Sequence, residues 1–127
     1  MKKILVADDN PAILDALKIM LEDEGYEVET TEDGAVAQNM KAPLPDLLLL
    51  DVWMSGIDGR DVCQHLKAAA ATKHIPVILI SAAKNIDRIA KDAGADDFIS
   101  KPFQMKHLLA TVAVQINKQK LRRKIHS

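Results

Sequence analysis

Five polar side chains that could do chemistry each lie at or just after the end of an apolar stretch of the sequence. Asp8 and Asp9 follow the first stretch, and Asp51 ends a run of leucines. Ser81 and Lys101 follow the later stretches. Carboxylates held close together repel one another unless a cation neutralises them. A hard divalent cation such as Mg²⁺ (or Mn²⁺) takes oxygen ligands of this kind, so a fold that gathers these residues would form a cation site flanked by a hydroxyl and an ammonium group.

The segments that must position these residues alternate between strand-like and helix-like patterns. Short, wholly apolar runs are typical of strands buried on both faces of a parallel sheet. Apolar residues at helical spacing predict amphipathic helices, and Asn10 followed by Pro11 is a typical helix start. The expected strands are 4–7, 26–30, 47–50, 75–80 and 97–100, and the expected helices are 11–24, 33–41, 59–71, 85–92 and 105–116.

This alternation predicts an α/β fold, an open and doubly wound parallel sheet with right-handed crossovers and helices on both faces. Ligands of such sheets bind beyond the carboxyl ends of the strands, where the strand order reverses. With the order 2-1-3-4-5, Asp8, Asp9 and Asp51 would meet at that point. We expect one domain over 1–127, with a core at about 2–117 and a basic helical tail at about 118–127.

The composition is that of an ordinary soluble domain, with 48% hydrophobic and 28% charged residues. Its 17 basic and 18 acidic side chains give a formal net charge of −1, which argues against direct nucleic-acid binding. The single cysteine, Cys63, excludes an intrachain disulfide and suits a reducing compartment. No apolar run approaches the roughly 18 residues of a membrane span, and the start does not read as a signal peptide. We therefore expect a cytoplasmic protein.

The polar residues, with their neighbours, resemble the receiver domain of two-component response regulators (CheY-like). The matching segments follow one another in order from about residue 2 to 116: Asp8-Asp9, the strand ending at Asp51, Met54 with Gly56-Ile57-Asp58-Gly59, Ser81-Ala82, and Lys101-Pro102-Phe103. Each segment alone is a weak signal, but five in order, each at a strand end, are specific. The resemblance implies a flavodoxin-like (βα)5 fold with the strand order 2-1-3-4-5.

The resemblance also implies an aspartyl phosphate. Asp51 would accept a phosphoryl group from a sensor histidine kinase or a histidine phosphotransfer protein, as a carboxylate nucleophile can. Asp8, Asp9, Asp51 and the backbone carbonyl of Trp53 would bind the Mg²⁺. The domain would be a phosphoacceptor switch that assists only its own phosphorylation and dephosphorylation, and not an enzyme acting on other substrates.

The same resemblance assigns switch roles. Lys101 and Ser81 would contact the phosphoryl oxygens, Phe98 would turn inward as Ser81 is drawn toward them, and the Lys101–Pro102 peptide bond would be cis. The surface of the fourth helix, fifth strand and fifth helix would then contact a downstream protein, an output domain absent from this sequence, or a second copy in a homodimer.

Trp53 is unusually bulky for a residue so close to the expected phosphorylation site. Its bulk, two residues after Asp51, leads to the hypothesis that it shields the phosphoryl group and lengthens its lifetime, with Ala83 near Ser81 as a second influence on water access. A rival hypothesis, a Mg²⁺-dependent phosphatase with an aspartyl nucleophile, would need a general acid where Trp53 stands. A flavin or nucleotide module of this fold would need a Gly-rich loop, which the sequence lacks.

The basic run at 118–124 has two interpretations. Cations at the end of a helix are favoured by the helix dipole, and this is the interpretation that we prefer. Alternatively, the last helix continues into a dimer or partner contact, because Val114, Leu121 and Ile125 extend its apolar stripe.

Overall fold

The computed structural model describes residues 1–54 and 56–126, without the side chains of residues 120 and 122–126. Its main sheet has the strand order β2-β1-β3-β6-β7, all parallel, which confirms the predicted 2-1-3-4-5 order. The strands are β1 (Lys3–Ala7), β2 (Glu27–Thr31), β3 (Leu47–Asp51), β6 (Val77–Ser81) and β7 (Asp97–Ser100). The helices are α1 (Pro11–Asp23), α2 (Gly34–Gln38), α3 (Gly59–Ala68), α4 (Ile86–Ala93) and α5 (Met105–His126).

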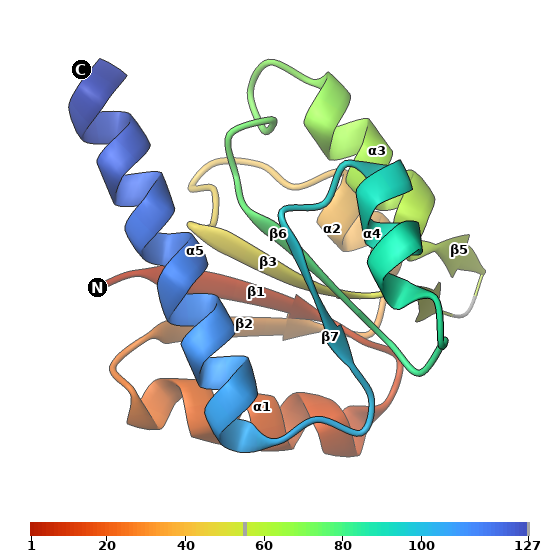
Figure 1. Cartoon of the computed structure of the whole chain (residues 1–127). Coiled ribbons are helices and arrows are strands. Elements are labelled where there is room, and N and C mark those ends of the chain that lie inside the picture. Colours follow the sequence, from red (N-terminus) through yellow and green to blue (C-terminus); the bar gives the residue numbers. More distant parts are fainter. Residues whose placement is uncertain (55, 127) are drawn as a thin grey trace.

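Helices cover both faces of the sheet (Figure 1). Successive residues of a strand point to opposite faces, so the leucines of β3 divide between two cores. Leu47 and Leu49 pack with α1 and α5, whereas Leu48 and Leu50 pack with α2, α3 and α4. All four leucines are fully buried. A strand that is apolar on both faces can therefore end in a polar residue only where it leaves the two cores, and β3 does so at Asp51.

Local signals in the sequence set most helix starts. The Asn10 side chain accepts hydrogen bonds from the backbone N–H groups of Ala12 and Ile13, and Pro11 opens α1. Gly94 ends α4 in the left-handed conformation, with φ of 79°. These features confirm the predicted starts and stops of α1 and α4 to within two residues.

Three predicted boundaries were wrong. The helix expected over 33–41 spans only Gly34–Gln38, because Asp33 is its N-cap and Asn39 ends it. The helix expected to reach residue 71 ends at Ala68, since the Thr72 hydroxyl donates to the Leu66 carbonyl that the next turn would use. The strand expected from residue 75 begins after Pro76, which has no N–H to donate to a ladder.

The sequence patterns also missed a small hairpin next to Asp51. β4 (Trp53–Met54) and β5 (Ile57–Asp58) form an antiparallel pair in which Trp53 lies opposite Asp58. At the other end of the chain, α5 continues through the basic tail to His126. Leu121 is exposed on this helix, and the side chain of Ile125 lies outside the described residues. In the described part of the chain, no helix combines the length and the apolar character of a membrane span.

Candidate functional site

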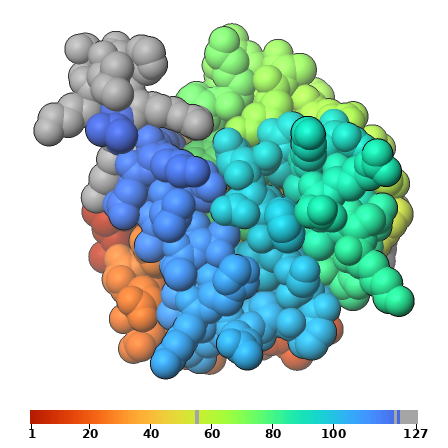
Figure 2. Space-filling view, in the orientation of Figure 1, coloured from red at the N-terminus to blue at the C-terminus, as the bar shows by residue number. Residues whose placement is uncertain are grey.

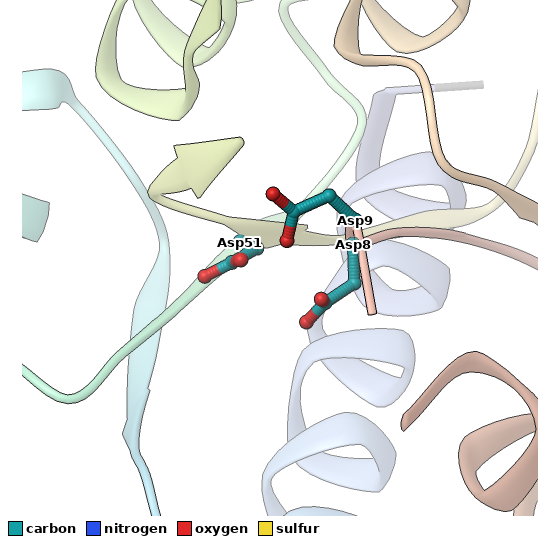
Figure 3. Close-up of side chains that lie close together, drawn as sticks. All are labelled: Asp8, Asp9 and Asp51. Carbon is teal, nitrogen blue, oxygen red and sulfur yellow. The ribbon is translucent and has the colours of Figure 1, made fainter. Parts of the chain in front are cut away.

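Three carboxylates meet at the carboxyl ends of neighbouring strands. β1 pairs with β3 so that Ala7 lies opposite Leu50, and each strand is then followed or ended by an aspartate. One oxygen from each of Asp8, Asp9 and Asp51 lies within 4.8 Å of the others. Figure 3 shows the three side chains directed into one space at this edge of the sheet. The predicted meeting of the acidic residues is therefore confirmed.

Lys101 joins this cluster from the end of β7. Its backbone N–H donates to the Ser81 carbonyl at 2.9 Å, which ties the β7 end to the β6 end. Its Nζ lies 3.0 Å from Asp8 Oδ2 and 3.5 Å from Asp51 Oδ1. The Lys101–Pro102 peptide bond is cis, as expected. One ammonium group therefore bridges two of the three carboxylates.

The carboxylates remain in excess over this single ammonium group. Burial and, to a lesser degree, the neighbouring Asp8 carboxylate together raise the pKa of Asp51 from 3.8 to about 6, although Lys101 acts in the opposite direction. Asp8 and Asp51 are almost fully buried, with 1% and 5% exposed. Such a cluster of three carboxylate oxygens fits a hard divalent cation such as Mg²⁺.

Ser81 ends β6 beside this cluster. The residue is 1% exposed, and its hydroxyl oxygen accepts a hydrogen bond from the Ala83 backbone N–H at 3.0 Å. That bond uses the oxygen as an acceptor and leaves the O–H to donate. Ser81 therefore still has an O–H donor on its side chain, while its own backbone carbonyl accepts the hydrogen bond from Lys101.

Gly59 allows α3 to pack directly behind Asp51. A Cβ at this position would lie 2.3 Å from the Asp51 carbonyl oxygen and 2.9 Å from Val52 Cα. The Gly59 N–H also donates to the Val52 carbonyl at 2.8 Å. The backbone at the end of β3 is thus fixed from behind, and any larger residue at position 59 would displace it.

Phe98 lies apart from the acidic cluster. Its side chain is 36% exposed on β7 and lines a hollow of about 340 Å³ together with Pro102, Phe103 and His107 among others. The structure therefore has Phe98 on the surface and not turned inward. Its movement on phosphorylation remains a prediction.

Trp53 contributes an exposed ring at the rim of the site. The indole is 55% exposed, and the guanidinium carbon of Arg60 lies 4.9 Å from a Trp53 ring centroid. Arg60 in turn donates from Nε to both carboxylate oxygens of Asp58, at 3.1 and 3.0 Å, and these hydrogen bonds lower the pKa of Asp58. This contact of Arg60 was not predicted from the sequence. Its only signal was an acidic and a basic residue two positions apart at a helix start.

Comparisons with known proteins agree with this geometry. A family model, the response regulator receiver domain, matches residues 4–113. The chain is 43% identical over 115 residues to the DNA-binding dual master transcriptional regulator RpaA of Synechocystis sp., covering 88% of this chain and 48% of that protein. It is 47% identical over 113 residues to the response regulator PleD of Caulobacter vibrioides, covering 87% of this chain and 25% of that protein. The chain thus spans half or less of the length of these relatives.

Solved structures show the same architecture. The signal receiver domain of a signal transduction histidine kinase from Syntrophus aciditrophicus superposes with a TM-score of 0.85 at 31% identity, covering 93% of this chain and 92% of that one. The Vibrio cholerae chemotaxis protein CheY4 superposes with a TM-score of 0.80 at 28% identity, covering 89% and 97%. The chain therefore belongs to the response regulator receiver domain family and has its flavodoxin-like fold.

Proposed function

We propose that this receiver domain is a phosphorylation switch whose acceptor is Asp51. The observation that supports this most directly is the bridge from Lys101 Nζ to Asp8 and Asp51 within a cluster of three carboxylates. The donor would be a phosphohistidine of a histidine kinase or a phosphotransfer protein. The transfer would modify each chain once and would not release a product in cycles, so the domain is a switch and not an enzyme.

In the proposed transfer, a carboxylate oxygen of Asp51 attacks the phosphorus of the phosphohistidine. A new P–O bond forms while the P–N bond breaks, and the electron pair of the P–N bond stays on the imidazole nitrogen. Lys101 is placed to pair with the phosphoryl oxygens, because its Nζ already lies 3.5 Å from Asp51. The Ser81 O–H donates to another of these oxygens. Both residues therefore stabilise the charge of the transferred group.

Mg²⁺ would be held by Asp8, Asp9, Asp51 and the Trp53 backbone carbonyl. When bound, it would supply positive charge to the carboxylates and to the phosphoryl oxygens. The pKa of Asp51 is raised first by burial and then by the nearby Asp8 carboxylate, and a bound cation would offset both effects. The residues present thus fit the cation in charge and in ligand type.

Phosphorylation would be transmitted through Ser81 and Phe98. An added phosphoryl group gives the Ser81 O–H a new acceptor, and only such a difference between the two states can shift a conformational equilibrium. Phe98 would then leave its exposed position and turn inward. The surface that changes is formed by α4, β7 and α5, which make one continuous face in Figure 2. A downstream protein, an output domain of a longer chain, or a second copy would bind this face.

The test is incubation with a small acyl phosphate donor and Mg²⁺, followed by intact mass measurement. We expect addition of one phosphoryl group that hydroxylamine removes, because acyl phosphates are labile to it. Asp51→Asn should abolish the addition, and Asp46→Asn, a carboxylate at the opposite end of β3, should leave it unchanged. Equal addition to the parent and to Asp51→Asn would exclude Asp51 as the acceptor. Sustained turnover of phosphate monoesters would instead support the phosphatase hypothesis.

A further inference from the structure

The Trp53 ring is held in place by a pair of charged residues that the proposed transfer does not use. Trp53 and Asp58 lie opposite each other in the β4–β5 hairpin, and Arg60 reaches back from the first turn of α3 to both. A cation over an aromatic face is attracted by the ring quadrupole at about this distance. Arg60 therefore links the other two side chains, and the group of Trp53, Asp58 and Arg60 is here called the Trp53 latch.

Asp58 gives this latch a fixed base. The same carboxylate that receives the Arg60 guanidinium also caps α3, because its Oδ1 accepts from the Arg60 backbone N–H at 2.9 Å. A carboxylate that binds a guanidinium through two oxygens restricts its orientation more than a single hydrogen bond does. Arg60 is therefore oriented by Asp58, and its guanidinium orients the Trp53 indole in turn.

The latch lies at the rim of the proposed acceptor site. Trp53 is two residues from Asp51, and Gly59, between Asp58 and Arg60, packs against the Asp51 carbonyl. With 55% of its surface exposed, the indole has room to rotate unless something holds it. An indole held in one orientation excludes water from its side of the rim continuously, whereas a rotating indole does so only part of the time.

We propose that Arg60 is a positioning residue that slows loss of the phosphoryl group from Asp51 by holding the Trp53 indole. This inference rests on the proposed function. In the loss reaction, the oxygen of water bonds to phosphorus, and the acyl P–O bond breaks with its electron pair returning to the Asp51 carboxylate. The two protons of the water leave with inorganic phosphate, so Asp51 is regenerated unchanged. Arg60 touches none of these atoms and acts only through Trp53.

Arg88 provides a matched control. It lines the same groove of about 310 Å³ between α3 and α4 as Arg60 does. Among the described residues, only Arg60 is found over the Trp53 ring. Replacing Arg88 therefore removes a guanidinium from the same groove without removing the Trp53 latch.

The experiment compares the parent with Arg60→Met, Arg60→Lys and Arg88→Met. Each is phosphorylated with a small acyl phosphate and Mg²⁺, freed of donor, and followed by intact mass. Trp53 is the only tryptophan, so acrylamide quenching of its fluorescence reports directly on the latch. Arg60→Met should lose the phosphoryl group about two- to five-fold faster, the factor expected from an exposed cation–π contact, and should be quenched more readily. Arg60→Lys keeps the positive charge but not the planar guanidinium, so its rate of loss and its quenching should lie between those of the parent and Arg60→Met. Arg88→Met should match the parent.

Three results would overturn the inference in distinguishable ways. If Arg60→Met changes quenching but loses the group at the parent rate, the latch exists and does not control the lifetime. If quenching is unchanged in Arg60→Met, or if Arg88→Met has the same effect as Arg60→Met, Arg60 does not hold the Trp53 indole. A parent that takes up no phosphoryl group would overturn the proposed function, and this inference with it.

Discussion

Two lysine–aspartate centres lie at opposite ends of the sheet and differ in their charge balance. At the amino ends of β6 and β7, Lys67 Nζ donates to Asp96 Oδ2 at 2.6 Å and to the Ile75 carbonyl at 2.8 Å. Asp96 Oδ2 also accepts from the Val77 backbone N–H at 2.8 Å. At the carboxyl ends, by contrast, Lys101 pairs with both Asp8 and Asp51 within a cluster of three carboxylates.

The contrast separates a lysine–aspartate pair with balanced charge from one placed in a carboxylate cluster, which is where the proposed chemistry would occur. Lys67 and Asp96 cancel each other's charge, and each also forms a hydrogen bond with the backbone, Lys67 with the Ile75 carbonyl and Asp96 with the Val77 N–H, which suits a partly buried pair. The cluster around Lys101 keeps net negative charge, and burial of Asp51 adds to its cost. A site that retains such a cost is suited to a positively charged ligand that relieves it.

The largest expected effect comes from breaking the balanced centre. Lys67→Met should lower the free energy of unfolding by about 3 kcal/mol, because it leaves the Asp96 carboxylate largely buried without its cation. Urea denaturation would measure this change. Lys91→Met, at an exposed position of α4, should change the free energy by less than about 0.5 kcal/mol. A Lys67→Met variant as stable as Lys91→Met would show that the two centres do not differ as described.

A smaller change, of opposite sign, is expected in the unbalanced centre. Without metal at pH 7, Asp51→Asn should raise the free energy of unfolding by about 2 kcal/mol, because the pKa of the native carboxyl is raised from 3.8 to about 6. The native state then binds more protons than the unfolded state between these values. The parent therefore loses stability as the pH rises through about 4 to 6, and the advantage of Asp51→Asn should nearly vanish below about pH 4.

Urea denaturation across pH, in the presence of a chelator, checks this window. Asp96→Asn is the matched control at the other end of the sheet, and it should destabilise the protein because Lys67 loses its carboxylate. If Asp51→Asn destabilises the metal-free protein at pH 7, the ionised Asp51 carboxylate does not cost the stability that its burial and its raised pKa indicate.

Much of the fold could be predicted because its signals are local. The four buried leucines before Asp51 identify a strand between two cores, and Asn10 and Gly94 mark helix ends through their own side chain or conformation. The acidic cluster followed from topology, since the carboxyl ends of parallel strands meet at one edge. The same topology predicted Lys101 as a neighbour of the cluster, because it follows the last strand, whereas its role toward a phosphoryl group came only from the family resemblance.

The remaining features depend on contacts that a pattern does not encode. The β4–β5 hairpin is too short for any periodicity, and the stack of Arg60 on Trp53 depends on how that hairpin meets α3. The predicted end of α3 was wrong because the Thr72 hydroxyl donates to the Leu66 carbonyl, which a further helical turn would need. Helical propensity favoured continuation through the alanines before it, and a side-chain hydrogen bond decided otherwise.

The most direct measurement is the effect of Mg²⁺ on unfolding of the parent and two variants. A cation that binds only the folded state stabilises it by about 2.7 kcal/mol at a hundredfold excess over Kd. We expect the urea midpoint of the parent to rise with Mg²⁺, and that of Lys67→Met to rise by a similar increment from its lower start. The increment should be much smaller in Asp51→Asn. No rise in the parent, or an equal rise in Asp51→Asn, would contradict a cation site formed by these carboxylates.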